Sequence, residues 1–327
     1  MSENRSAGDV AIPRRDDLEN ARQVIRAHLR PTPVDPGAGT PGDPGLKLES
    51  LQPTGSFKVR GALNAVAAAP GTRVVTASAG NHGLGVAYAA GRLGRRATVV
   101  VPETASVAKV DGLRRLHVDL VRTGDGFDEA EEHALALAEA PGCHYISAYN
   151  DPYVIAGQGT IGHELDEQFD GPLTVVCAIG GGGLASGLGL WAAGRADVRV
   201  VGVEAAASTA VSAAVAAGRR VPVEVGPTLA DGLAGNIEPG SATIGLVARH
   251  VHQLVTVTED EIRAALRYLA AERGHVAEGA GAVPVAALLA GKVAVHGRVV
   301  AVVSGRNITP AALAAVLAAG EAAPAAS

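Results

Sequence analysis

The stretch LTVVCAIGGGGLASGLGLWAAG, residues 173–194, decides the fold. Its first part, Leu173–Ile179, is a run rich in valine and other β-branched residues without polar alternation, which is typical of a strand covered on both faces. Four consecutive glycines, Gly180–Gly183, then open a segment of helical character. Because amides without neighbouring side chains can converge on a phosphate at a helix N-terminus, the stretch predicts a strand, an anion-binding turn and a helix.

Similar valine-rich runs alternate with longer alanine-rich stretches along the chain, which predicts an α/β fold with parallel or mostly parallel twisted sheets flanked by helices. We expect strands at Thr72–Ala77, Ala97–Val101, Val118–Arg122, Val198–Glu204 and Arg298–Val303, and a short strand at His144–Ser147. In such folds ligands bind beyond the carboxyl ends of the strands, so the loops that follow the strands are where a site is expected.

The composition narrows the class of protein. The chain has 327 residues, 47 % of them hydrophobic and 19 % charged, which suits a packed interior and two lobes around a cleft. A net charge of −5 without a long basic run does not favour nucleic acid as a partner. No apolar stretch reaches the roughly 18 residues needed to cross a membrane, so we expect no membrane contact and a cytoplasmic location. The only cysteines, Cys143 and Cys177, are far apart, which argues against a disulfide framework or a zinc site.

Three further loops carry polar residues suited to chemistry. In PTGSFK, residues 53–58, Lys58 stands at the start of a helical stretch, where burial and the helix dipole both lower the pKa of an amine. In SAGNHG, residues 78–83, the amides at a helix start favour a carboxylate. In SGRN, residues 304–307, Ser304 follows the last strand and is expected to face the same cleft.

The glycine turn by itself also fits a nicotinamide-dependent oxidoreductase. Gly180, Gly182 and Ala185 match the dinucleotide pattern, and Glu204 stands where an acid that binds ribose would follow. This alternative leaves Lys58 and Ser304 without a role.

Taken together, PTGSFKVRGA, SAGNHGLGVA, IAGQGTIGHEL, GGGGLASG, TLADGL and SGRN resemble the fold-type II pyridoxal-phosphate enzymes, specifically the serine/threonine dehydratase and serine racemase group. The blocks stand in that family's order and extend from about Lys47 to Asn307. The resemblance implies β-elimination, that is, dehydration and deamination, of a small β-hydroxy amino acid such as L-threonine or L-serine. The products would be a 2-oxo acid and ammonia.

The resemblance also assigns roles to individual residues. Lys58 would hold pyridoxal 5'-phosphate as a Schiff base and remove the Cα proton, with Phe57 packed beside the ring. Asn81 would bond the 3-hydroxyl and Ser304 the pyridine nitrogen. The expected phosphate site is formed by Gly180, Gly181, Gly182, Gly183 and Leu184, and the expected substrate site by Ser78, Ala79, Asn81, His82 and Tyr149.

Several departures from the family pattern bear on the reaction. Ala79 stands where the racemases have a serine that exchanges protons, so racemisation is not expected. Glu204 matches one metal ligand of the racemases but a second carboxylate is absent, which predicts a monovalent or weakly bound divalent cation. Tyr149 and Arg306 replace common residues and could alter the choice of substrate, and the role of Glu278 is open.

Turn residues at Tyr149–Pro152 indicate a boundary between two lobes. We expect residues 1–70 and 151–327 to form a large cofactor-binding domain and residues 71–150 a small domain. The tails, residues 1–15 and 320–327, are expected to be disordered. A homodimer or homotetramer is expected. A third hypothesis is a protein that binds pyridoxal phosphate with little turnover.

Overall fold

The computed structural model describes residues 11–319 and contains two separate sheets. The six-stranded sheet has the order β1-β2-β10-β7-β8-β9 and the four-stranded sheet the order β5-β4-β3-β6. The strands are β1 (Val34–Asp35), β2 (Gly45–Lys47), β3 (Arg73–Ala77), β4 (Arg96–Val101), β5 (Asp119–Arg122), β6 (Cys143–Tyr145), β7 (Leu173–Ala178), β8 (Val198–Ala205), β9 (Gln253–Val257) and β10 (Arg298–Val302). All strand pairs are parallel except β1 with β2, so the predicted fold class is confirmed.

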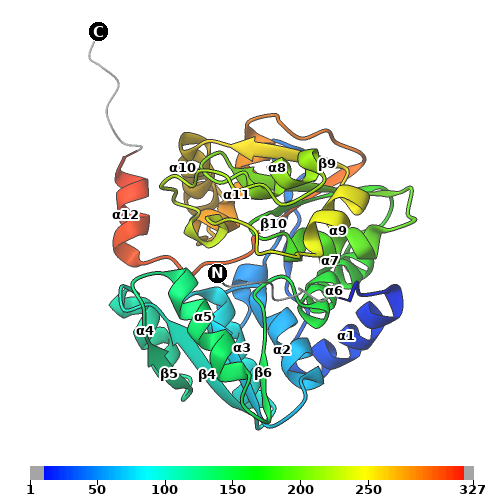
Figure 1. The fold of residues 1–327 in the computed structure, drawn as a ribbon. Helices are drawn as coiled ribbons and strands as arrows, with labels where there is room; N and C mark the ends of the chain where they lie inside the picture. The colour runs from blue at the N-terminus through cyan, green and yellow to red at the C-terminus, as the bar shows by residue number, and fades with distance from the viewer. Residues whose placement is uncertain (1–10, 320–327) are drawn as a thin grey trace.

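Helices cover both sheets, as Figure 1 shows with the six-stranded sheet in its upper half and the four-stranded sheet below. The α-helices are α1 (Arg15–His28), α2 (Lys58–Ala68), α3 (Asn81–Arg92), α4 (Val107–Arg114), α5 (Phe127–Ala138), α6 (Pro152–Gln168), α7 (Gly183–Ala192), α8 (Ala210–Ala217), α9 (Thr243–His250), α10 (Glu259–Arg267), α11 (Gly279–Leu289) and α12 (Pro310–Ala318). Short helical turns lie at η1 (Glu49–Leu51), η2 (Asp231–Leu233) and η3 (Tyr268–Glu272).

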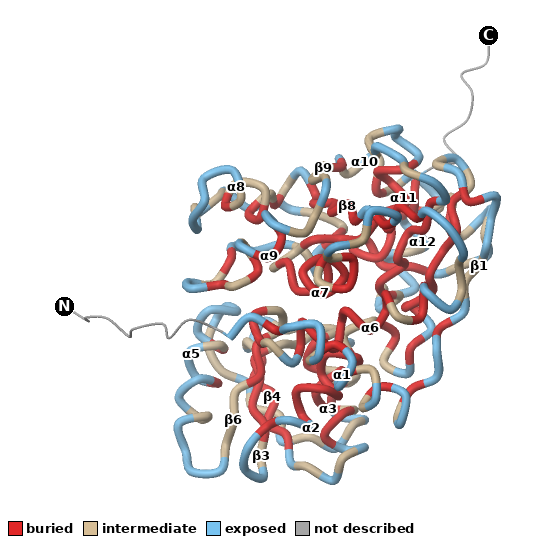
Figure 2. Tube along the Cα trace, turned by 90° about the vertical axis from the view of Figure 1, so that its right-hand side faces the viewer, coloured by how far each residue is buried: buried red, intermediate tan, exposed pale blue. Residues whose placement is uncertain are grey.

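The central strands of the larger sheet bury alternate residues on opposite faces. Val176 and Val203 join one apolar cluster with residues of α11, whereas Val175 and Val200 join another with residues of α6 and α7. Figure 2 shows the buried segments concentrated in α7, β8 and α11 and again in α2, α3 and β4. Burial on both faces explains why these strands read as continuous apolar runs.

The helix that begins at Lys58 packs with the smaller sheet. Val59 and Leu63 of α2 belong to the same buried cluster as Val74 of β3 and Val86 of α3. The two sheets are joined through α2 and α6, and the division of the chain into domains at residues 70 and 151 stays a prediction.

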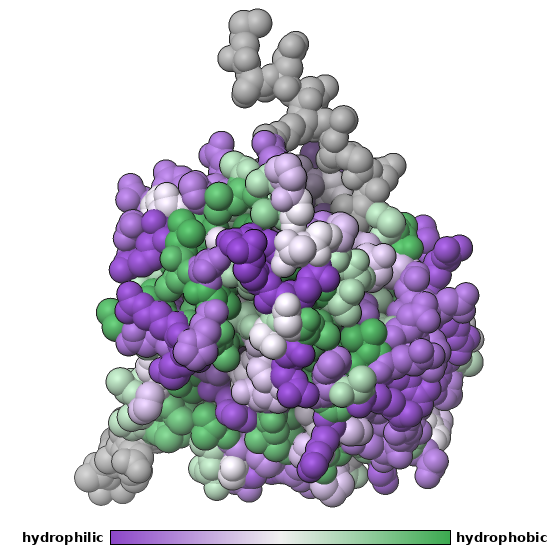
Figure 3. Space-filling view, turned by 90° about the horizontal axis from the view of Figure 1, so that it is seen from below, coloured by the Kyte–Doolittle hydropathy of each residue, from purple (hydrophilic) through white to green (hydrophobic). Residues whose placement is uncertain are grey.

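The ends and the surface of the chain add little to the site. Of the expected tails, residues 1–10 and 320–327 lie outside the described residues, and α1 already begins at Arg15. On the face that Figure 3 shows, hydrophobic side chains form patches bordered by hydrophilic ones. Within residues 11–319 no helix is long and apolar enough to cross a membrane.

Candidate active site

A cleft of about 900 Å³ brings the predicted loops together. The predicted residues that line it are Phe57, Lys58, Ser78, Ala79, Asn81, His82, Tyr149, Gly180, Gly181, Gly182, Gly183, Leu184 and Ser304. The cleft is also lined by Lys109, Asp231, Glu278, Arg306 and Asn307. The residues come from both sheets and from α2, so the cleft lies where the two halves of the molecule meet.

The amine of Lys58 lies inside this cleft. Lys58 is the first residue of α2, and its Nζ donates to the carbonyl of Ala148 at 2.7 Å and lies 5.3 Å from the centre of the Phe57 ring. Burial lowers the pKa of Lys58 to about 8, although the nearby charge of Glu278 acts in the opposite direction. An amine with such a pKa is partly neutral near pH 8 and is therefore a competent nucleophile and base.

The glycine turn leads from β7 into α7 and presents free amides. The N–H groups of Gly180, Gly181 and Gly182 have no acceptor among the described residues. A Cβ at Gly181 would lie 2.4 Å from the Tyr149 ring, and Gly182 has a φ of 91°, so the turn cannot take larger residues without rearrangement. Unpaired amides at a helix N-terminus form a cradle for a phosphate group.

Asn81 is held by two neighbours at the start of α3. Its Nδ2 donates to Glu278 Oε1 at 2.6 Å, and its Oδ1 accepts from Asn307 Nδ2 at 2.6 Å. Ser78 accepts a hydrogen bond from the amide of Gly80 at 3.2 Å. The polar groups of this loop therefore face the cleft in fixed positions.

His82 is buried beneath the same loop and is neutral. Its Nε2 lies 3.2 Å from the carbonyl oxygen of Ile146, and burial, together with the charge of Lys58, lowers the pKa of its ring to about 3. Its Nδ1 has no partner within the described chain.

The Tyr149 hydroxyl accepts a hydrogen bond from a residue that does not line the cleft. The backbone N–H of Glu238 donates to the Tyr149 hydroxyl at 2.8 Å, while the ring packs against the glycine turn. The Tyr149 hydroxyl thus already accepts one hydrogen bond, whereas its own O–H donates to no acceptor among the described residues. One N–H of the Arg306 guanidinium donates to the carbonyl of Ser50, and the residue also lines the cleft.

Ser304 reaches the cleft from the end of β10, as expected. It is buried, its Oγ lies 3.5 Å from the carbonyl of Ala280, and its own carbonyl accepts from the amide of Phe57 at 2.9 Å. That contact of the hydroxyl is long for a hydrogen bond, so the hydroxyl is free to bind another acceptor or donor.

Glu204 does not line the cleft. Its carboxylate accepts from the amides of Val211 at 2.8 Å and Ser212 at 3.0 Å at the start of α8. The described residues contain no group of three or more His, Cys, Asp or Glu that could hold a metal. The expected cation and the ribose-binding role of Glu204 therefore find no support.

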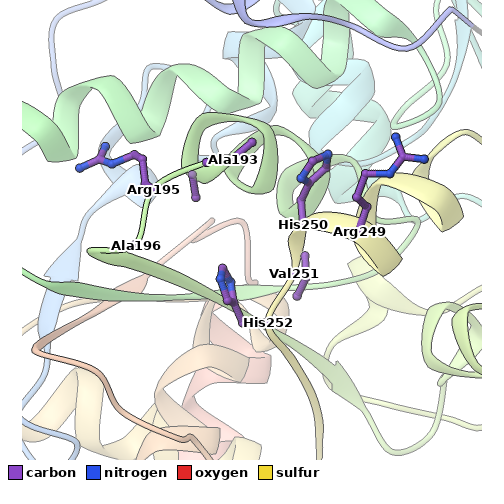
Figure 4. Close-up of a pocket in the computed structure, with 9 residues that line it drawn as sticks. Ala193, Arg195, Ala196, Arg249, His250, Val251 and His252 are labelled. Atoms are coloured by element: carbon purple, nitrogen blue, oxygen red, sulfur yellow. The ribbon is translucent and has the colours of Figure 1, made fainter.

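A smaller pocket of about 370 Å³ lies elsewhere, where α7 and α9 end (Figure 4). It is lined by Ala192, Ala193, Gly194, Arg195, Ala196, Arg249, His250, Val251 and His252. None of these residues was predicted to belong to a site, and Arg195 is paired with Asp166 and Asp197. The larger cleft is the candidate active site.

An α/β fold, a buried amine and a glycine turn with free amides define the class of enzymes that hold an aldehyde cofactor with a phosphate group. The chain belongs to the pyridoxal-phosphate dependent enzyme family, whose model matches residues 25–305. It has the fold-type II architecture of the serine/threonine dehydratase and serine racemase group. The nicotinamide alternative is therefore wrong.

Named relatives agree with this assignment. The chain is 45 % identical over 275 residues to an L-threonine ammonia-lyase of Thermotoga maritima, covering 82 % of this chain and 68 % of the relative. It is 35 % identical over 306 residues to a catabolic L-threonine dehydratase of Staphylococcus aureus, covering 89 % of this chain and 88 % of the relative.

Solved structures are similar along most of the chain. Maize serine racemase has a TM-score of 0.85 at 28 % identity, and the match covers 95 % of this chain and 98 % of the racemase. The processed form of a threonine deaminase from Solanum lycopersicum has a TM-score of 0.82 at 31 % identity, and the match covers 97 % of this chain and 98 % of the deaminase.

Several site residues were not found by sequence reasoning. Lys109 and Asp231 form an ion pair of 2.9 Å, and both line the cleft. Thr243 donates to the carbonyl of Gly181 at 2.8 Å and so supports the glycine turn. Only Asp231 carried a signal, because it lies in the TLADGL block.

Proposed function

We propose that this protein eliminates water and ammonia from a small β-hydroxy amino acid such as L-threonine or L-serine, giving a 2-oxo acid. The observation that carries the proposal is the position of the Lys58 amine in the same cleft as the free amides of Gly180–Gly182. Relatives and solved structures named for threonine deamination support the choice of reaction.

The cleft fits pyridoxal phosphate by the chemistry of its donors. The amides of the glycine turn would hold the phosphate, Lys58 would bind the aldehyde, and the Ser304 hydroxyl would bond the pyridine nitrogen. Asn81 would face the 3-hydroxyl. When bound, the cofactor withdraws electrons from the Cα of an amino acid and so makes its proton acidic.

The chain's own residues then decide the course of the reaction. Lys58, with a pKa lowered to about 8, can act as the base that removes a proton. The amides at the start of α3 would hold the substrate carboxylate beside Ser78 and Asn81. Ala79 carries no group that exchanges protons, so a second base on the opposite side is lacking at this position and elimination is favoured over racemisation.

A neutral partner at the pyridine nitrogen favours the same outcome. The Ser304 hydroxyl would leave that nitrogen largely unprotonated, which would favour the loss of a β-leaving group. A cytoplasmic location, a homo-oligomeric state and a bound cation stay predictions.

Replacing Lys58 by alanine tests the proposal. Wild-type protein supplied with pyridoxal phosphate should show a visible absorption band that borohydride abolishes, and should release a 2-oxo acid and ammonia. K58A should lose both the band and the activity, whereas K292A, in which the exchanged lysine lies outside the cleft, should retain both. Undiminished turnover in K58A would contradict the proposal.

The substrate is identified by measuring 2-oxo acid release from L-threonine, L-serine, β-hydroxyaspartate and β-phenylserine. We expect the first two to react fastest. A protein with the absorption band but no turnover of any of the four would be a binding protein.

A further inference from the structure

Glu278 is a buried acid in the cleft to which the proposed reaction gives no role. It precedes α11 as the N-cap residue, yet its side chain makes no capping hydrogen bond to that helix. The residue is 7 % exposed and lines the cleft. Because an unpaired buried carboxylate is costly, the direction of this side chain away from the helix and toward the cleft calls for a specific partner.

That partner is Asn81. Glu278 Oε1 accepts a short hydrogen bond from Asn81 Nδ2 at 2.6 Å. Asn307 donates to the other end of the same amide at 2.6 Å, so the orientation of Asn81 is fixed by one acceptor and one donor. The second N–H of Asn81 Nδ2 is then left for the cleft.

Gly305 in the SGRN loop leaves space for the Glu278 carboxyl because it has no side chain. A Cβ at Gly305 would lie 2.1 Å from Glu278 Oε1, so a side chain at position 305 would displace the carboxyl. The amide of Glu278 also donates to the carbonyl of Gly305 at 3.0 Å. The backbone of the SGRN loop at Gly305 therefore fixes where the Glu278 carboxyl can lie.

The charge of the Glu278 carboxylate affects the pKa of Lys58. Burial raises the pKa of Glu278 to about 7, and the charge of Asp231 raises it further, while Asn81 and Lys109 act in the opposite direction. In return, an ionised Glu278 raises the pKa of Lys58. An anion near an amine or a protonated imine favours the cationic form.

We propose that Glu278 holds Asn81 in place and, when ionised, keeps a proton on the bond between Lys58 and the cofactor. This inference rests on the proposed function, because it assumes that pyridoxal phosphate occupies the cleft. Glu278 acts through Asn81 and through its field, so it is a positioning residue.

The test is a pH titration of the visible absorption band of the cofactor-loaded protein in wild type, E278Q and E278D. Glutamine keeps an oxygen to accept from Asn81 and removes only the charge. We expect the midpoint of the spectral transition to fall by about one pH unit or more in E278Q, because the protonated form loses a nearby anion. In E278D, which keeps the charge, the midpoint should stay nearer to that of wild type.

D231N is the matched control, because Asp231 is an exposed carboxylate at the same cleft. Water screens an exposed charge, so its removal should move the midpoint much less than E278Q does. An equal shift in D231N and E278Q would overturn the proposal, as would an unchanged or raised midpoint in E278Q. In each of these cases the band itself would persist, so the proposed function would stand.

If E278Q loads too little cofactor for a spectrum, the midpoint is read in cofactor-free protein from the pH dependence of Lys58 labelling by an amine-reactive reagent. We expect a lower labelling midpoint in E278Q than in wild type, since Glu278 raises the pKa of Lys58. An unchanged labelling midpoint would overturn the proposal.

Discussion

At the scale of single residues, the contact between Gly181 and Tyr149 explains why position 181 in the glycine turn has no side chain. Gly181 lies against the ring of Tyr149, where a Cβ would approach to 2.4 Å. The ring is itself fixed, because its hydroxyl accepts from the amide of Glu238. Neither partner can move away without disturbing the amides that would bind the phosphate.

G181A should therefore bind the cofactor more weakly and lose stability. We expect a loss of about 1–3 kcal/mol in the free energy of unfolding, which is the usual range for overpacking. Thermal unfolding of cofactor-free protein and titration with pyridoxal phosphate measure the two effects. G42A is the control, because a Cβ at Gly42 meets nothing within 4 Å and the residue is exposed and lies outside the helices and strands. Equal behaviour of the two variants would contradict the prediction.

At the scale of elements, α2 is anchored by a buried ionic network two residues beyond Lys58. The Arg60 guanidinium donates to both oxygens of Glu49 at 2.7 Å and to Glu164 at 2.7 Å. Lys47 reaches Glu164 at 2.6 Å, and the side chains of Lys47, Glu49 and Arg60 are fully buried. The network joins β2, η1, α2 and α6 and so fixes the start of the helix that carries the reactive amine.

R60M should destabilise the protein strongly. Methionine fills part of the space but leaves two carboxylates facing one lysine, and breaking a buried ion pair costs about 3–5 kcal/mol. R60K keeps the charge and loses the planar fork, so its loss should be intermediate. Urea unfolding of wild type, R60K and R60M measures the free energy of unfolding of each, which we expect to decrease in that order. A free energy of unfolding in R60M equal to that of wild type would show that the network contributes little.

At the scale of the whole molecule, the order of elements followed from the sequence because the central strands are buried on both faces. Every predicted valine-rich run forms a strand. The strands that were missed are β1 and β9 at the sheet edges, together with the short β2. Edge strands such as Gln253–Val257 bury only part of their residues and leave no continuous apolar run.

Local residue types predicted the glycine turn, since four glycines after a strand are unusual. The roles of Lys58, Asn81 and Ser304 were predicted only from the resemblance of several motifs together, although all three do line the cleft. The partnership of Asn81 with Glu278 joins positions 197 residues apart. Such pairs depend on how the two sheets meet, which no local pattern encodes.

Glu238 is another buried acid that contacts a distant segment of the chain, and its titration makes the stability of the protein depend on pH. Its carboxylate lies 3.4 Å from the Ser147 hydroxyl, and burial raises its pKa to about 7, with repulsion from Glu131 and Asp151 adding to the effect. Because the folded state then holds a proton that the unfolded state has released, this group makes the protein less stable as pH rises from about 4.5 to about 7.

E238Q removes that dependence while keeping an oxygen that accepts from Ser147. The variant should be more stable than wild type above pH 7, by about 3 kcal/mol or about 4–5 °C in Tm, and should have no such advantage at pH 4.5. Thermal unfolding across this pH range measures the difference between the two proteins. A difference that does not change with pH would mean that Glu238 titrates normally and that the contact between residues 147 and 238 is open to water.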